Sequence, residues 1–364
     1  NTTGTLNVAV GANALDANTT GYSLTAVGMH ALGSNTSGFQ NTGCGYGAGG
    51  SITTGDNNVA VGHNAGGSIT TANNNTAVGQ SAMSANTTGQ ENVAIGKGSM
   101  DACTTGTENT AVGTDSLGDL TTGDFNVAVG RQAGFSLTTG SRNHAFGHEA
   151  LESCTTGANN IAVGKDSLRA NTTGSQNVAI GSFNLDANTT AANNTSIGYF
   201  TLSAVTTGAS NTAVGMAAGE YVTTGGNNLL LGMDAGRSNS PCGNLTTDNN
   251  VVCLGNNSIT SLYCKISTIQ TSDIRDKTDV TDFKHGLSWV EKLRPITYKW
   301  DMRSNYEDGV PDGSKKEEKL HLGFIAQEEL EIEKEHGFAN DKNDMLLVNE
   351  NNDGNYGMYY DRLV

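Results

Sequence analysis

One short charged segment, Ser272 to Lys277, holds a serine and a lysine, two residue types that can together do nucleophilic chemistry. A serine hydroxyl becomes a nucleophile when a base takes its proton. A lysine amine can be that base only if burial or nearby cations lower its pKa towards neutral. Arg275 would lower the pKa of Lys277, whereas Asp273 and Asp276 would oppose this. A serine and a lysine five residues apart are also common surface residues, so this pair gains weight only from its context.

Metal and cofactor chemistry has little support. The chain has six cysteines and no CxxC pair, so a zinc site is not indicated. Cys103 and Cys154 are three repeats apart, about 14 Å in stacked strands, which is too far for a disulfide. We interpret most cysteines as buried, small apolar residues of a protein made in a reducing cytosol. His285, His321 and His336 lack ligand spacing, and neither a metal nor a cofactor is predicted.

The composition excludes two classes of partner. The formal net charge is −16, and no cluster of Lys and Arg is present to neutralise phosphates, so nucleic-acid binding is not expected. No apolar run approaches the ~20 residues of a membrane-spanning helix, so membrane insertion is not expected either. The first residues, Asn1 to Gly4, start in the middle of a repeat, and we expect the chain to be a fragment.

Most of the chain repeats. The motif Asn-x-Ala-Val-Gly recurs, and its last glycine returns every 17 residues from Gly11 to Gly232. A further copy ends at Gly255 after 23 residues, which predicts a six-residue insertion within Arg237 to Leu245. Seventeen residues are too few for a helix-pair repeat of ~33 residues or a propeller blade of ~40. They suit one coil of a β-solenoid, with two short strands and two turns.

The coil is expected to have a thin core. Alternation places the Val position and the Thr/Val position of the motif on one face, and Ala and Asn on the other. We expect one Val or Ile, one Leu or Met and an Ala to point inward, and stacked asparagines to form an amide ladder. Small cores are marginal alone. Packing the flat alanine faces of three chains about an axis would relieve this, so a homotrimer is predicted.

The Thr-Thr-Gly turn that closes each unit has two interpretations. Flat arrays of alternating threonines bind ice. The threonines here are adjacent, as in Thr19-Thr20-Gly21, so their side chains diverge. A turn in which Thr caps hydrogen bonds is therefore favoured. As a whole, the unit resembles the head repeats of trimeric autotransporter adhesins, which form trimeric parallel β-rolls.

After Gly255 the repeats stop and both tryptophans appear. We predict an amphipathic segment at 284–293 with Leu287, Val290 and Leu293 on one face, and a helix at 327–335. Strands are predicted at 296–300 and 321–326. A hairpin is predicted from 346–348 and 358–360, around Asn352-Asp353-Gly354. The chain is thus mostly β, with a trimeric parallel β-solenoid of 17-residue coils and a small α+β domain.

The motifs of this last region, in their order, resemble the intramolecular chaperone auto-processing domain of phage tail spikes and fibres. They are Ser272-Asp273-x-Arg275-x-Lys277, Leu293-Arg294-Pro295-x-x-Tyr298-x-Trp300, Gly323-Phe324-Ile325-Ala326-Gln327-Glu328 and Tyr360-x-x-Leu363. The resemblance divides the chain into a shaft at 1–255, a linker at 256–271 and the chaperone domain at 272–364. In the family a trimeric coiled-coil helix usually follows, which a chain ending at Val364 would lack.

The resemblance implies a serine peptidase that acts on its own chain, with no external substrate. Cleavage would fall between Thr271 and Ser272, with Ser272 as nucleophile and Lys277 as base. Asp273, Arg275, Gln327 and Glu328 would support the site, although helix capping explains the last two equally well. Ser272 would either attack its own preceding carbonyl or be activated across the trimer. A domain that chaperones without cutting is the alternative.

The expected protein is a viral tail fibre or spike on the virion, assembled in the host cytoplasm, that adsorbs to a host receptor, expected to be a glycan. One alternative is a cell-surface trimeric adhesin. The other is a tailspike that degrades polysaccharide, which needs a pair of carboxylates in a groove. The shaft acids scatter over turn positions, which indicates a solvated surface; examples are Asp16, Asp101, Asp115 and Glu149.

Overall fold

A computed structural model describes residues 2–260, 284–303, 306, 310–341, 344–350 and 356–358. The chain divides into two compact units, Asn1–Thr260 and Ser261–Val364, each of which is described by itself. The first unit is the shaft. Among the described residues, none belongs to a helix long and apolar enough to cross a membrane.

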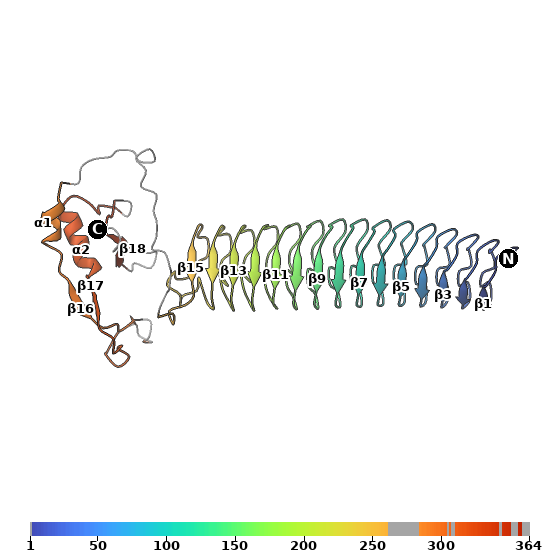
Figure 1. The fold of residues 1–364 in the computed structure, drawn as a ribbon, viewed down its shortest axis with the longest axis horizontal. Coiled ribbons are helices and arrows are strands. Elements are labelled where there is room, and N and C mark those ends of the chain that lie inside the picture. Colours follow the sequence, from blue (N-terminus) through green and yellow to red (C-terminus); the bar gives the residue numbers. More distant parts are fainter. Residues whose placement is uncertain are drawn as a thin grey trace. The chain divides into compact units, whose positions relative to one another are not determined.

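The shaft contains one parallel sheet of 15 three-residue strands in sequence order (Figure 1). Each strand pairs with its equivalent in the next coil, so that Ala111 faces Ala128. The strands are β1 (Val8–Val10), β2 (Thr25–Val27), β3 (Thr42–Cys44), β4 (Val59–Val61), β5 (Thr76–Val78), β6 (Val93–Ile95), β7 (Thr110–Val112), β8 (Val127–Val129), β9 (His144–Phe146), β10 (Ile161–Val163), β11 (Val178–Ile180), β12 (Thr195–Ile197), β13 (Thr212–Val214), β14 (Leu229–Leu231) and β15 (Val252–Leu254).

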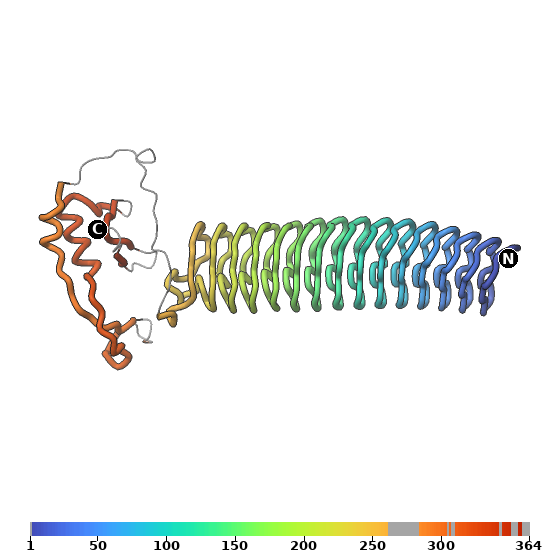
Figure 2. Tube along the Cα trace, viewed as in Figure 1, coloured from blue at the N-terminus to red at the C-terminus, as the bar shows by residue number. Residues whose placement is uncertain are grey.

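Each coil has one strand, not the two that the sequence predicted. The wall opposite the sheet is made of turns, and the tube trace shows the same narrow outline repeated from coil to coil (Figure 2). The Leu/Met position of this wall has left-handed backbone, with φ of 49° at Leu117 and 52° at Leu168. A residue in that conformation cannot continue a strand, so the second strand does not form.

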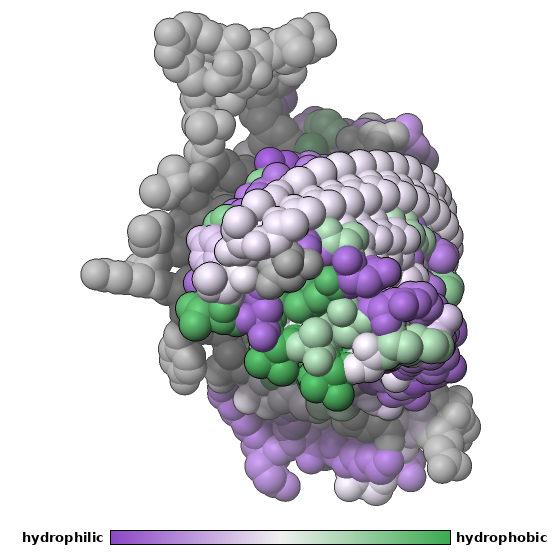
Figure 3. Space-filling view, turned by 90° about the vertical axis from the view of Figure 1, so that its right-hand side faces the viewer, coloured by the Kyte–Doolittle hydropathy of each residue, from purple (hydrophilic) through white to green (hydrophobic). Residues whose placement is uncertain are grey.

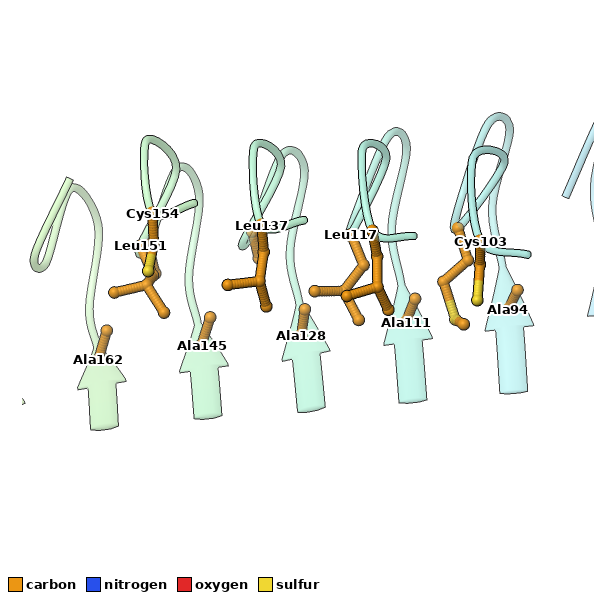
Figure 4. Packing of buried hydrophobic residues seen from close by; sticks show 14 of the residues in the cluster. Ala94, Cys103, Ala111, Leu117, Ala128, Leu137, Ala145, Leu151, Cys154 and Ala162 are labelled. Carbon is orange, nitrogen blue, oxygen red and sulfur yellow. The ribbon is translucent and has the colours of Figure 1, made fainter. Parts of the chain in front are cut away.

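The alanine face points inward, which corrects the predicted packing. The central strand residues Ala111, Ala128 and Ala145 are 0–2% exposed. The flanking valines point out, and Val129 is 37% exposed. The reason is the width of the coil: the strand lies so close to the opposite wall that an alanine fills the space (Figure 4). The proposed packing of alanine faces between chains is therefore wrong.

Two positions of each coil, four and seven residues after the glycine that ends the strand, form two columns on the opposite wall. Their side chains fill the space next to the alanines, and a small residue in the first column is paired with a large one in the second. Five coils have glycine in the first column, and each of them has Ile, Leu or Val in the second column. In four of them that residue lies three positions after the glycine, and in the last coil it follows the insertion. Coils with Leu or Met in the first column mostly carry Asn or Cys in the second. The five compensated pairs are Gly49 with Ile52, Gly66 with Ile69, Gly134 with Leu137, Gly219 with Val222 and Gly236 with Leu245.

The predicted asparagine ladder is present and buried. The Asn126 side-chain oxygen accepts the backbone N–H of Asn143 at 3.0 Å, and its amide nitrogen donates to the Gly140 carbonyl at 3.0 Å. The same pattern recurs from coil to coil, for example at Asn143. Each asparagine thus satisfies backbone groups at the turn that the single sheet leaves unpaired.

The turns follow the favoured interpretation of Thr-Thr-Gly. The first threonine hydroxyl donates along the shaft, as Thr138 Oγ1 does to the Thr155 carbonyl at 3.1 Å, so it is engaged in capping. The glycine that ends each strand is required. Gly130 has φ of +139°, and an added Cβ would lie 2.3 Å from the carbonyl oxygen of Gly147.

The insertion lies where the sequence placed it. Thr223 bonds to Thr246, 23 residues on, whereas other coils bond 17 residues on. The extra residues form a loop in which Arg237 pairs with Glu220 and Asp234. Cys242 and Cys253 form a disulfide there, which corrects their assignment as free apolar residues. Cys103 and Cys154 are buried and free as expected, and Cys44 is free but exposed.

The second unit has short elements in the predicted order, and its two hairpins are antiparallel. They are α1 (Gly286–Val290), β16 (Ile296–Tyr298), β17 (His321–Gly323), α2 (Ala326–Glu335), β18 (Val348–Glu350) and β19 (Tyr356–Met358). Leu330, Ala339 and Val348 form a small core between α2 and β18. The predicted apolar face of the first helix is wrong: Leu287 and Val290 are 72% and 60% exposed, and Trp289 is the buried residue.

Candidate functional site

The predicted catalytic segment lies outside the described residues. This applies to Thr271, Ser272, Asp273, Arg275 and Lys277, so the serine–lysine pair and its cleavage site stay predictions. Gln327 and Glu328, the two supporting residues of α2, are described. The site is therefore built from the motifs that surround α2.

Pairing of β16 with β17 brings two of the predicted motifs together. Ile296 lies opposite Gly323, so the Leu-Arg-Pro motif that precedes β16 meets the start of α2. Arg294 donates from two guanidinium nitrogens to Glu328, from Nε to Oε2 at 3.0 Å and from Nη2 to Oε1. The Glu328 carboxylate raises the pKa of Arg294. Gln327, the residue before Glu328 on α2, is exposed.

A second ion pair holds the same two segments together. Lys292 pairs with Glu335, seven residues after Glu328 on α2. Residues seven apart lie on one face of a helix, so Lys292 and Arg294 attach the segment before β16 along one side of α2. The Lys292 ammonium lowers the pKa of Glu335. Both pairs are exposed, and pairs of this kind add little stability. They orient the segment more than they stabilise it.

The other side of α2 carries a buried carboxylate that organises the next strand. Glu333 is fully buried and accepts three successive backbone N–H groups, from Leu346 at 2.9 Å, Leu347 at 2.5 Å and Val348 at 3.0 Å. Three charge-assisted bonds compensate much of the cost of burying a carboxylate. Glu333 thereby fixes where β18 begins relative to α2.

Glu329, one turn earlier on α2, is buried without such compensation. It is 1% exposed, and its Oε2 has no hydrogen-bond partner among the described residues. Burial, together with the negative charges of Glu328 and Glu333, raises the pKa of Glu329 to about 7. Glu329 therefore exchanges a proton near neutral pH, next to the helix start that bears the supporting residues.

An aromatic cluster closes the far end of α2. The His336 ring lies 5.0 Å from the ring of Trp289 and 4.8 Å from that of His285, and Phe338 is 6.0 Å from Trp289. His336 Nδ1 is 2.8 Å from the Ile332 carbonyl. His321 stacks on Tyr298 at 5.5 Å. All three histidines of this unit pack against aromatic side chains.

The buried acids were not found from the sequence. Glu329 and Glu333 are four apart on a helix that is predominantly charged, so each would be expected to face solvent. One sequence feature could have indicated the burial of an acid: this charged helix is followed by the apolar segment Leu346-Leu347-Val348, which packs against it. A strand start that must satisfy several N–H groups needs acceptors, and Glu333 supplies them.

The shaft holds one cluster of metal-ligating side chains among the residues described. Ligand atoms of His148, Glu149 and Asp166 lie within 4.8 Å of one another. Arg131 reaches both His148, at 3.1 Å, and Glu149, at 3.3 Å, and Lys165 lies 3.6 Å from Asp166. Two protein cations already balance the two carboxylates, so the cluster is an ion-pair network.

Comparison with known proteins gives one match. Residues 272–338 match the family described as chaperone of endosialidase. Searches of curated proteins and of solved structures gave no significant match. The matched segment begins at Ser272 and includes α1, β16, β17 and α2. The chain thus joins a parallel β-solenoid to an endosialidase-type chaperone region, a combination that fits a tail fibre.

Proposed function

We propose that the chain is part of a homotrimeric bacteriophage tail fibre or tail spike, carried on the virion and assembled in the host cytoplasm. In this proposal residues 1–255 are the shaft, 256–271 a linker and 272–364 a chaperone domain that aligns three chains. The observation that carries the proposal is the chaperone-of-endosialidase match over residues 272–338. The shaft supports it, because a stack of coils is suited to an elongated fibre.

A shaft of this kind needs an alignment device. Most coils present the same strand pattern, and a slip of 17 residues sets most alanines on alanines and the strand-ending glycines on glycines. Repeats of low diversity specify register weakly. A C-terminal domain that associates first would start three chains in step, after which coils close one after another.

The domain would then remove itself. Ser272 attacks the carbonyl carbon of Thr271 and breaks the peptide bond to its own nitrogen, while Lys277 takes the hydroxyl proton and passes it to that nitrogen, which leaves as an amine. Water then hydrolyses the resulting ester, which releases Thr271 as a carboxylate. A lysine amine can accept that proton only if its pKa is lowered in the folded trimer. Loss of the aligning domain leaves the shaft kinetically trapped, because unfolding must open many coils.

The test is expression of the full chain beside Ser272→Ala and Lys277→Ala, with Ser314→Ala as a matched control at an exposed serine. Wild type and the control should yield two fragments, one ending at Thr271 and one beginning at Ser272 by mass spectrometry. Both site variants should stay whole. A whole wild type that is trimeric would refute cleavage and leave the chaperone role. A monomeric wild type would refute both.

We further propose that the fibre adsorbs to a receptor on the host surface, which we expect to be a glycan. The aromatic residues exposed on the shaft, such as Tyr22, Tyr46 and Tyr199, offer faces on which sugars stack. Binding of the purified trimer to host cells, before and after removal of their surface polysaccharide, would test this. Equal binding to stripped cells would refute a glycan receptor.

A further inference from the structure

The outward side of the sheet forms a continuous apolar strip. We call the first and third residues of β1–β15 the outer face. Its third position is always Val, Ile, Leu, Phe or Cys, and its first position is Val, Thr, Ile, Leu or His. Viewed from the N-terminal end, equivalent positions of successive coils follow one another in rows of similar hydropathy (Figure 3). Third-position residues 37–40% exposed include Val27, Ile95, Val129, Phe146, Ile180, Ile197, Val214, Leu231 and Leu254.

Charge is excluded from this strip, and a few charged residues, such as Glu91 and Lys97, stand beside it. The outer face has no Asp, Glu, Lys or Arg, although the chain has a net charge of −16. A sheet with one face in water normally alternates apolar and polar residues. Here the inward position is mostly alanine, the third position is apolar or Cys in every strand, and the first position is Val, Ile or Leu in eight strands, Thr in six and His in one. The outer face is therefore more apolar than a face left in water, and a second apolar surface would cover it.

The dimensions of the outer face match a protein interface. Fifteen strands at ~4.8 Å spacing and three residues at ~3.3 Å give a strip about 70 Å by 10 Å, or roughly 700 Å². Apolar patches on monomers are typically ~300–600 Å², and a standard interface covers ~800 Å² per partner. The cover must be as long, as narrow and as regularly apolar as the strip itself, and another copy of this chain meets that requirement.

The charged borders indicate how copies meet. Glu91 and Lys97 lie on opposite sides of β6, and both are exposed. Neither has an ion-pair partner among the described residues. When faces close around a three-fold axis, one border of each chain meets the opposite border of the next. Sheets pack ~10 Å apart, so each face lies ~5 Å from the axis. In cross-section the three faces then form a triangle with sides of ~17 Å, about five residues. The residues that flank each strand, such as Glu91 and Lys97, therefore lie near its corners.

We propose that three shafts pack in register through their outer faces, with the apolar strips around the axis and Glu91 of each copy against the partner subunit's Lys97. This deepens the proposed function and rests on its homotrimer. It also reverses the inter-chain packing expected from the sequence, because the alanines are enclosed within each coil and the valine face is the one available.

Cys44 is a native probe of this arrangement, because it occupies the third position of β3 and its thiol is exposed in the single chain. The experiment measures maleimide labelling of Cys44 in the native full chain, by mass spectrometry of its peptide. The interface variant is Val27→Asp with Val61→Asp and Ile95→Asp. The matched control places the same charges on exposed turns, as Thr20→Asp with Thr54→Asp and Thr88→Asp.

Labelling of Cys44 should be about tenfold slower or more in wild type and control than in the interface variant, since covered groups react only through opening. Circular dichroism must show the same β content in all three, and Thr in place of Asp at Val27, Val61 and Ile95 is used if it does not. A wild type that sediments as a trimer yet labels as fast as the interface variant would overturn the outer-face interface and leave the trimer standing. A wild type that sediments as a monomer would overturn both.

A charge exchange tests the register. Glu91→Lys or Lys97→Glu alone would place like charges at the corners and lower the dissociation temperature of the shaft. The double exchange should restore it. In one chain these two described residues flank opposite ends of β6 and form no ion pair with each other, so recovery in the double variant requires contact between copies. Additive losses would overturn the in-register pairing.

Discussion

The shaft should tolerate Gly66→Leu and Ile69→Asn when the two changes are made together, and should be destabilised by either change alone. Ile69 is 1% exposed, and a Cβ added to Gly66 would lie 2.9 Å from Ile69 Cδ1. In another coil the same two positions hold Leu168 and Asn171, and the Asn171 amide donates to the Gly174 carbonyl at 3.0 Å. The double variant Gly66→Leu/Ile69→Asn would reproduce that arrangement beside the Ala72 carbonyl.

The magnitudes follow from the packing. Ile69→Asn alone removes a buried branched side chain and should cost about 2–4 kcal/mol. Gly66→Leu alone forces a side chain into occupied space and should cost about 1–3 kcal/mol. Leu tolerates the left-handed backbone of this position, since Leu168 has φ of 52°. The double variant should therefore cost about 1 kcal/mol, which is a coupling energy of at least about 2 kcal/mol.

The assay is native-state hydrogen exchange of amides in this coil, because a long shaft opens locally before it unfolds. Gly66→Leu combined with Leu120→Asn, three coils away, is the control and should be additive. If Gly66→Leu/Ile69→Asn loses as much protection as the two single variants together, the two columns do not compensate and the account of the core is wrong.

Three further results are expected. The folded-state pKa of Glu329, about 7, exceeds its ordinary 4.5, so the protonated form favours folding and stability falls as pH rises between these values. Glu329→Gln should remove this pH dependence and raise the free energy of unfolding by about 1–2 kcal/mol at pH 8, after allowance for solvent screening. Urea unfolding monitored at Trp289 measures this, and an unchanged pH profile would contradict it. Asn126→Leu should cost about 2–4 kcal/mol, because the Asn143 N–H and the Gly140 carbonyl lose their partner in the interior; exchange rates of the adjacent coils equal to wild type would refute the ladder's role. Cys242→Ala should lower the opening energy of β15 by about 2–3 kcal/mol, as expected for a short closed loop, and a reductant should do the same to wild type but not to the variant.

The repeat length, the strand position, the insertion and the asparagine ladder were all readable from the sequence, because each follows from spacing alone. The inward face was not. Alternation separates Val from Ala but does not say which set is enclosed, and hydropathy favours Val. The distance to the opposite wall decides, and that distance depends on Leu117 and its equivalents adopting left-handed backbone, which leucine seldom does.

In the C-terminal unit, turn and periodicity signals predicted most elements in order. The exceptions are packing decisions. Trp289 is buried in place of Leu287 because His336 and Phe338 offer it an aromatic surface. Glu333 is buried because the start of β18 needs acceptors, and Glu329 is buried one turn earlier without such partners among the described residues. Neither choice leaves a periodic trace in the sequence, and the serine–lysine pair stays a prediction.

The shaft varies the residues of its two enclosed columns and keeps its outer face nearly uniform. Gly66 with Ile69 and Leu168 with Asn171 differ, but these columns contact only the same chain, so they carry no information about a neighbouring copy. The outer face, which would contact the neighbouring copies, varies little, because most of its residues are Val, Thr or Ile. Few coils, such as that of Glu91 and Lys97, bear opposite charges on both borders. Register between chains must therefore come from elsewhere, which is the physical reason to expect an aligning domain at 272–364.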